Sequence, residues 1–141
     1  MIQIHIESVE VPVVNQELFC SWLEDVVASE GAQLGDIQFV FCSDDYLLEI
    51  NKKYLNHDYF TDIISFDYTL ENLISGDLFV SINRVNDNAL EYNCAVVDEL
   101  LRVCVHGVLH LLGYKDKTPE DTEIMRSKEN FYLARYVSRG T

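Results

Sequence analysis

The chain has 141 residues, with 24 acidic against 10 basic side chains and a formal net charge of -14 at pH 7, a balance that argues against a free-standing nucleic-acid-binding module because such modules usually present a basic surface. Its length and its 48% hydrophobic content allow one well-packed domain over residues 1–141 and no second one. No stretch reaches the roughly 18 apolar residues of a membrane span and the start lacks a signal-peptide pattern, so we expect a cytoplasmic protein with no membrane partner.

The first part of the chain alternates strand and helix patterns. Residues 2–6 alternate apolar and polar side chains, which predicts a strand with His5 on one face of a sheet. Residues 15–30 carry apolar side chains at helical spacing and are followed by glycine, which predicts an amphipathic helix. A second strand is expected at 34–42, and a serine at its end is placed to cap a helix that runs to residue 54.

The rest of the chain predicts two strands followed by three helices. The strands are expected at 62–68 and 73–81, and the helices at 83–92, at 96–112 and from Thr118 onward. This order of elements is typical of an α+β fold with a four-stranded mixed sheet. Because the helix at 96–112 is apolar nearly all round, we expect it to be buried at the centre of the fold.

A run between residues 106 and 116 indicates a metal site. His106 and His110 are four positions apart in the predicted helix, so both imidazoles lie on one face. Gly113 permits the turn past the helix end that brings Asp116 toward them. Two buried imidazoles need polar partners, and a shared metal ion would provide them. The alternative interpretation is that both are ordinary core histidines. Three protein ligands leave one position open, so these residues are the expected catalytic centre as well as the expected ligands.

The ligand types fit one divalent ion, with zinc as the first choice and other first-row transition metals as alternatives. The spacing matches the motif of the metzincin proteases except at Gly107, where those enzymes carry the glutamate that takes a proton from water. This substitution argues against peptide hydrolysis.

The histidine run, His-Gly-x-Leu-His-Leu-x-Gly-Tyr from residue 106, resembles the YbeY family of bacterial endoribonucleases that mature ribosomal RNA. The segments 51–54, 61–66 and 76–81 resemble further family segments in the same order, and together these motifs cover roughly residues 40–130. The resemblance implies a zincin-like YbeY fold around the metal helix. It also implies a single-strand-specific, metal-dependent endoribonuclease that acts in maturation of the 3′ end of small-subunit ribosomal RNA and in ribosome quality control.

Two positions depart from the family pattern. Most members have histidine as the third ligand where this chain has Asp116, a mild change because a carboxylate oxygen also binds zinc. Leu55 occupies a position where the family usually has arginine, and leucine cannot form the bidentate hydrogen bonds by which arginine binds a phosphate.

The resemblance places Asp62, Ser65 and Asp77 at sheet edges beside the metal, where they would bond water or substrate; capping of turns is their alternative role. The general base is left open between Asp62, Asp77 and the metal centre acting alone. The resemblance also places the loop residue His57 in the segment that contacts substrate in the family, and we expect His57 to be exposed rather than a fourth ligand.

Most basic residues lie in the last third of the chain, with the ligands. They are Arg102, Lys115, Lys117, Arg126, Lys128, Arg135 and Arg139. Arg102, Lys115 and Lys117 are the candidates for binding RNA, and ordinary solvated helix surface is the alternative. The expected partners are single-stranded RNA, ribosomal RNA in particular, and ribosomal proteins or the small ribosomal subunit, because an acidic protein can dock on a basic one.

The expected function is therefore RNA cleavage at a metal centre. Two other functions stay open at this point. One is a metal-dependent hydrolase of another class, such as a metalloprotease. The other is a ribosome-assembly factor whose metal is structural.

Overall fold

The computed structural model describes residues 1–139, with side chains as far as Val137, so the predicted surface role of Arg139 lies outside the described residues. The elements are β1 (Ile2–Ile6), α1 (Gln16–Ser29), β2 (Gln33–Cys42), α2 (Asp44–Leu55), β3 (Ile63–Asp67), β4 (Leu73–Ser81), α3 (Ile82–Glu91), α4 (Val96–Leu111) and α5 (Pro119–Arg139). The predicted α+β order is confirmed, and the predicted bounds differ by no more than one residue at each end.

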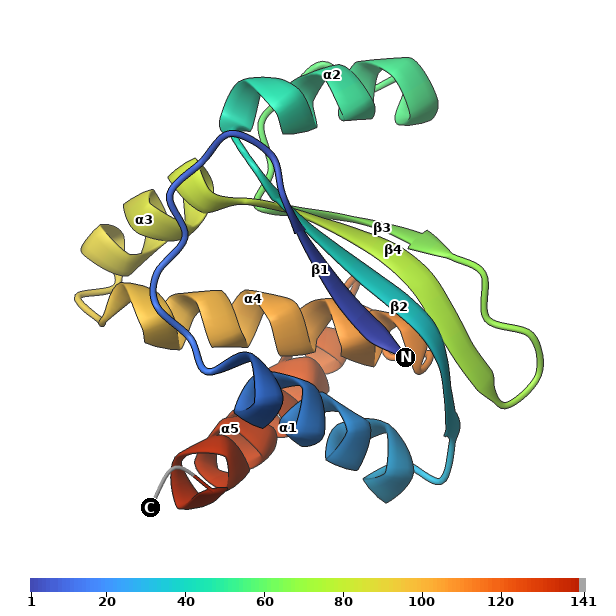
Figure 1. Cartoon of the computed structure of the whole chain (residues 1–141). Coiled ribbons are helices and arrows are strands. Elements are labelled where there is room, and N and C mark those ends of the chain that lie inside the picture. Colours follow the sequence, from blue (N-terminus) through green and yellow to red (C-terminus); the bar gives the residue numbers. More distant parts are fainter. Residues whose placement is uncertain (140–141) are drawn as a thin grey trace.

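The four strands form one mixed sheet in the order β1-β2-β4-β3. β1 and β4 each pair with β2 in parallel, whereas β3 pairs with β4 antiparallel and forms an edge of the sheet. Figure 1 shows the sheet on one side of α4, with α1 and α5 on the other side. α4, which carries both histidines, is thus enclosed between two layers, and the mixed sheet expected from the sequence is confirmed.

The core lies on both faces of the sheet. The larger part fills the space between the sheet and the helices α1, α4 and α5, where the fully buried Trp22 donates an indole hydrogen bond of 2.7 Å to the carbonyl of Tyr132. A smaller cluster under α2, on the other face, contains Cys42, Leu47 and Ile64. Because side chains alternate along a strand, the neighbours of Ile64 on β3 face α4.

The close approach of α4 to the sheet depends on Gly107. A Cβ atom at this position would lie 2.7 Å from Cδ1 of Ile63 and 3.2 Å from methyl carbons of Leu78. A glutamate here would point into the packed sheet, so the chain has no room for the protease carboxylate. Leu78 faces α4, and its neighbour Asp77 therefore faces away; the expectation that Asp77 lies beside the metal is wrong.

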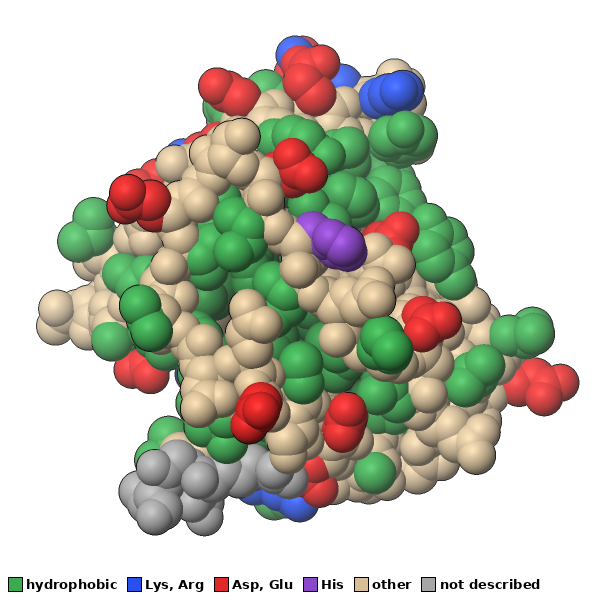
Figure 2. All heavy atoms as spheres, viewed as in Figure 1, with side chains coloured by type: hydrophobic (Ala, Val, Ile, Leu, Met, Phe, Trp, Pro, Cys, Tyr) green, Lys and Arg blue, Asp and Glu red, His purple; other side chains and the backbone are tan. Residues whose placement is uncertain are grey.

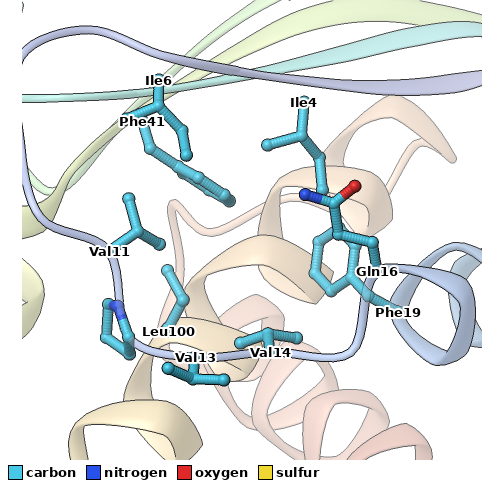
Figure 3. Close-up of a pocket in the computed structure, with 10 residues that line it drawn as sticks. Ile4, Ile6, Val11, Val13, Val14, Gln16, Phe19, Phe41 and Leu100 are labelled. Carbon is cyan, nitrogen blue, oxygen red and sulfur yellow. The ribbon is translucent and has the colours of Figure 1, made fainter.

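The face viewed in Figure 2 has scattered acidic side chains, while the Lys and Arg side chains visible on it lie mainly over α2 and near the lower edge. It is hollowed between β1 and the segment that leads to α1. Figure 3 shows this hollow, lined by apolar side chains such as Ile4, Phe41 and Leu100, with Gln16 as its polar group. Its lining contains no titratable side chain among the described residues, so the hollow is not a place for acid-base chemistry. No helix within residues 1–139 is both long and apolar enough to span a membrane.

Candidate metal centre

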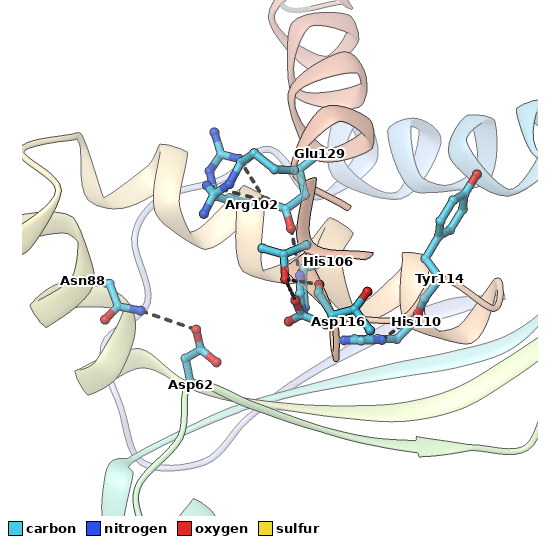
Figure 4. Close-up of polar contacts among 11 residues, drawn as sticks. Asp62, Asn88, Arg102, His106, His110, Tyr114, Asp116 and Glu129 are labelled. Atoms are coloured by element: carbon cyan, nitrogen blue, oxygen red, sulfur yellow. Dashed lines mark hydrogen bonds and ion pairs between the residues drawn. The ribbon is translucent and has the colours of Figure 1, made fainter. Parts of the chain in front are cut away.

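The two histidines lie one turn apart on α4, with ring centroids 4.5 Å apart and ring planes at 86°. Beyond the helix, Gly113 adopts φ +104°, and the amide of Tyr114 donates to the carbonyl of Leu109 at 3.0 Å. This turn sends the chain back toward the helix, as predicted. Asp116 Oδ2 then lies 3.6 Å from His106 Nε2 (Figure 4).

The three residues fit a single metal ion. One ligand atom from each of His106, His110 and Asp116 lies within 4.8 Å of the other two. Two imidazoles and a carboxylate are an accepted donor set for zinc and for other first-row divalent ions. Asp116 is exposed while the histidines are half-buried, so the centre opens toward solvent on the carboxylate side.

A buried carboxylate orients His106. Glu129 on α5 is 4% exposed, and its Oε2 lies 2.8 Å from His106 Nδ1. Arg102 donates to the other oxygen of Glu129 at 2.9 Å and to Oδ1 of Asn130 at 3.0 Å. When Nδ1 carries the proton that bonds Glu129, Nε2 presents its lone pair toward Asp116 (Figure 4).

His110 is oriented by the backbone. Its Nδ1 lies 2.9 Å from the carbonyl oxygen of Tyr114, the residue just beyond the glycine turn. The Tyr114 hydroxyl donates to Glu30 at 2.6 Å, and the same carboxylate accepts from Tyr132 and, at 3.1 Å, from Lys128. Glu30 is the C-cap residue of α1, so a chain of contacts connects α1 and α5 to the orientation of His110.

Burial and charge set different protonation tendencies within the site. Burial alone would lower the pKa of His106, but its hydrogen bond to Glu129 and the surrounding carboxylates raise that pKa above its ordinary value. Burial and the charge of His106 lower the pKa of His110, which favours the neutral form that binds metal. Burial raises the pKa of Asp62 more than His106 lowers it, so Asp62 takes up a proton more readily than an ordinary aspartate.

Two clefts meet at the metal centre. The first, which we call the α5 cleft, has a volume of about 240 Å³ and lies among α3, α4 and α5. The second, the β3 cleft, has a volume of about 500 Å³ and lies between α4, β3 and the segment that joins α2 to β3. Asp62, His106 and Asp116 line both clefts. A substrate in either cleft would therefore reach the metal centre.

The predicted substrate residues are placed unequally. Asp62 lines both clefts and Ser65 lines the β3 cleft. Arg102 lines the α5 cleft, but its guanidinium is already bonded to Glu129 and Asn130. Lys115 and Lys117 are exposed in the loop between α4 and α5, outside the lining of both clefts.

The segment between α2 and β3 supplies the remaining wall. His57 is exposed, as expected, and lines the β3 cleft together with Leu55. It is outside the group of three side chains that the described residues bring together for a metal.

Sequence reasoning missed Glu129 and Glu30. Glu129 contacts a histidine 23 positions away, and Glu30 contacts tyrosines 84 and 102 positions away, so no local spacing indicates either contact. One signal was available: Arg102 precedes His106 by four positions, and an arginine on the ligand face of a buried helix needs a carboxylate partner.

Comparisons with known proteins agree with this architecture. A family model described as Endoribonuclease YbeY matches residues 2–137. The chain is 53% identical over 122 residues to Endoribonuclease YbeY of Flavobacterium johnsoniae, covering 86% of this chain and 88% of that protein. It is 47% identical over 128 residues to Endoribonuclease YbeY of Bacteroides thetaiotaomicron, covering 91% and 93%. The solution structure of TM1509 from Thermotoga maritima is similar with a TM-score of 0.71 and 26% identity, over 99% of this chain and 91% of that one.

Proposed function

The chain belongs to the YbeY endoribonuclease family, and we propose that it is a metal-dependent endoribonuclease that hydrolyses phosphodiester bonds in single-stranded RNA. Its proposed substrate is ribosomal RNA, with maturation of the 3′ end of the small-subunit RNA and ribosome quality control as its tasks. We propose a cytoplasmic location. We also propose a ribosomal protein or the small ribosomal subunit as partner, because a net charge of -14 favours docking on a basic surface.

One observation carries this proposal: a three-residue ligand set lies where two clefts meet. A structural metal site is usually closed by a fourth protein ligand, whereas a catalytic site keeps a position for water or substrate. Here Asp116 is exposed, and the larger cleft of about 500 Å³ reaches both histidines. The geometry therefore favours catalysis over a purely structural metal, and the packing at Gly107 disfavours the protease alternative.

The proposed chemistry divides between the metal and the chain. A divalent ion held by His106, His110 and Asp116 would supply Lewis-acid stabilisation of the phosphodiester and make a nearby water easier to deprotonate. Glu129 and the Tyr114 carbonyl keep both imidazoles in the ligand orientation. Asp62 would accept the water proton at a carboxylate oxygen while the water oxygen bonds to phosphorus. The bond from phosphorus to the leaving oxygen breaks, and the leaving oxygen takes a proton from solvent.

The test is cleavage of a single-stranded fragment from the 3′ end of small-subunit RNA by the purified protein. We expect cleavage that a chelator stops and that one added divalent ion restores, with zinc as the first choice, and no hydrolysis of an unfolded protein substrate. An inactive protein that unfolds when its metal is removed would instead support the assembly-factor alternative. RNA cleavage that is unaffected by metal removal would contradict the proposed metal dependence.

A further inference from the structure

Among the described residues, the lining of the β3 cleft includes neither lysine nor arginine, although RNA is the proposed substrate. Its acidic lining residues are Asp62, Asp67 and Asp116, and its three histidines are His57 and the two candidate ligands. Lys52, at the nearby end of α2, lies 3.8 Å from a Glu49 oxygen and 3.6 Å from an Asp58 oxygen. Phosphate binding by side-chain cations is therefore a poor explanation for how this cleft would hold RNA.

The wall that carries Leu55 instead presents a stacked pair of rings. The rings of His57 and Tyr59 are 5.1 Å apart with an interplanar angle of 23°. The Tyr59 hydroxyl lies 2.9 Å from His57 Nδ1, and this contact holds the two rings in their stacked arrangement. Tyr59 is 55% exposed, so its ring is accessible from the cleft that it lines.

The backbone that carries these rings is fixed by Asn51. This residue is 1% exposed, and its side-chain amide donates to the carbonyl of Tyr59 at 2.9 Å. Its own carbonyl accepts from the amide of His57 at 3.1 Å. Asn56, between them, takes a left-handed conformation with φ 56° that turns the chain. Since Asn51 holds backbone atoms, replacing the Tyr59 side chain leaves this anchor in place.

We propose that the His57–Tyr59 pair is a stacking subsite for one unpaired nucleobase of the RNA. The inference rests on the proposed function and names how that site selects its substrate. Stacking uses the face of the base and needs no positive charge, so it suits an acidic cleft. A base can reach this wall when it is unpaired, and the pair would therefore favour single strands in a cleft that contains both histidine ligands.

The test combines a protein change with an RNA change. The substrate is a single-stranded RNA of about six nucleotides, a length typical of single-strand sites, in which one base at a time is removed to leave an abasic sugar. On intact RNA, Tyr59→Ala should lower kcat/KM of the metal-loaded protein roughly 5- to 150-fold, the range for one base stacked on an aromatic ring. At one abasic position the parent should lose the same factor, and the variant should lose nothing further.

Matched variants separate stacking from general damage. Tyr59→Phe keeps the ring and should stay within about 3-fold of the parent, the size of one exposed hydrogen bond. Phe131→Ala removes an aromatic ring that is also 55% exposed but lines neither cleft, and it should stay within about 2-fold. If Tyr59→Ala lowers the thermal midpoint, His57→Ala takes its place with the same expectation.

A fluorescent base analogue at the sensitive position gives an independent binding measurement. Its emission should be quenched on mixing with the parent and not with Tyr59→Ala. The subsite would be overturned if the losses in kcat/KM from Tyr59→Ala and from the abasic position add independently. It would also be overturned if Tyr59→Ala and Phe131→Ala have equal kcat/KM. A parent that quenches the analogue but cleaves no RNA would contradict the proposed function while supporting the subsite.

Discussion

The two clefts that meet at the metal centre are built in opposite ways. In the α5 cleft, charged side chains bond one another, and Arg102 and His106 share the carboxylate of Glu129. In the β3 cleft, Leu55 and the exposed ring of Tyr59 form a wall that contains no lysine or arginine among the described residues. We infer that the two clefts have different roles. Side chains of the α5 cleft orient the candidate metal ligands, and side chains of the β3 cleft contact the proposed substrate.

Asp62 belongs to both clefts and offers the largest expected effect. Asp62→Asn keeps the size of the side chain but removes the proposed proton acceptor, so kcat should fall by about 10²- to 10⁴-fold, the usual contribution of a general base. Metal content should be unchanged. Steady-state RNA cleavage and metal analysis measure the two effects. Asp67→Asn is the control, because Asp67 also lines the β3 cleft but is exposed. Equal activities for the two variants would remove Asp62 from the chemistry.

Asp116, at the junction, tests the ligand set. Asp116→Ala leaves two ligands, so metal affinity should fall by more than the roughly 10- to 100-fold cost of losing an outer contact. Asp116→His restores a ligand of the type common in the family and should retain the metal. Titration with zinc followed by metal analysis compares the variants. Full occupancy in Asp116→Ala would place the third ligand elsewhere.

Glu129 tests whether the α5 side orients the ligands. Glu129→Gln removes the charge behind His106 and leaves Arg102 without its buried partner, and metal affinity should fall about 10- to 100-fold. Glu123→Gln, an exposed position on the same helix, should change nothing measurable. A competitive chelator titration gives both affinities. Matching values would mean that His106 is oriented without its carboxylate.

The contrast between the clefts also explains what the sequence could predict. The grouping of the three candidate ligands was predictable because a helix brings positions four apart to one face and Gly113 turns the chain within a few residues. The pairing of Arg102 with Glu129 bridges 27 positions between two helices, and no local spacing encodes it. Asp77 was misplaced because β4 is covered on both faces, so its apolar pattern does not reveal which face each side chain takes.

Arg102 and the two loop lysines were expected to share one role, and the structure separates them. Arg102→Ala should lower metal affinity about 10-fold, the lower end of outer-contact effects, because Glu129 loses the group that positions it. The double change Lys115→Ala and Lys117→Ala should leave metal affinity intact. If these lysines bind phosphate, the double change should make the slope of log K for RNA binding against log salt concentration shallower by up to about 0.7 per lost contact. Binding measured across a salt series decides this, and an unchanged slope would exclude the lysines from the RNA surface.

The smallest expected effect concerns Glu30, which braces the turn behind His110. Burial would raise the pKa of this carboxyl, but its hydrogen bonds from Tyr114, Tyr132 and Lys128 hold the pKa below its ordinary value. A carboxyl whose pKa is lowered by folding stabilises the protein above its unfolded pKa, and this stabilisation is lost as pH falls through the lower folded value. Glu30→Gln should therefore be less stable than the parent at neutral pH, and the difference should shrink on acidification below about pH 4.3, the usual glutamate value. Thermal unfolding of the metal-free protein across this range provides the measurement, with Glu24→Gln as the exposed control on the same helix. A stability difference that is independent of pH would mean that Glu30 braces the turn through packing and not through its charge.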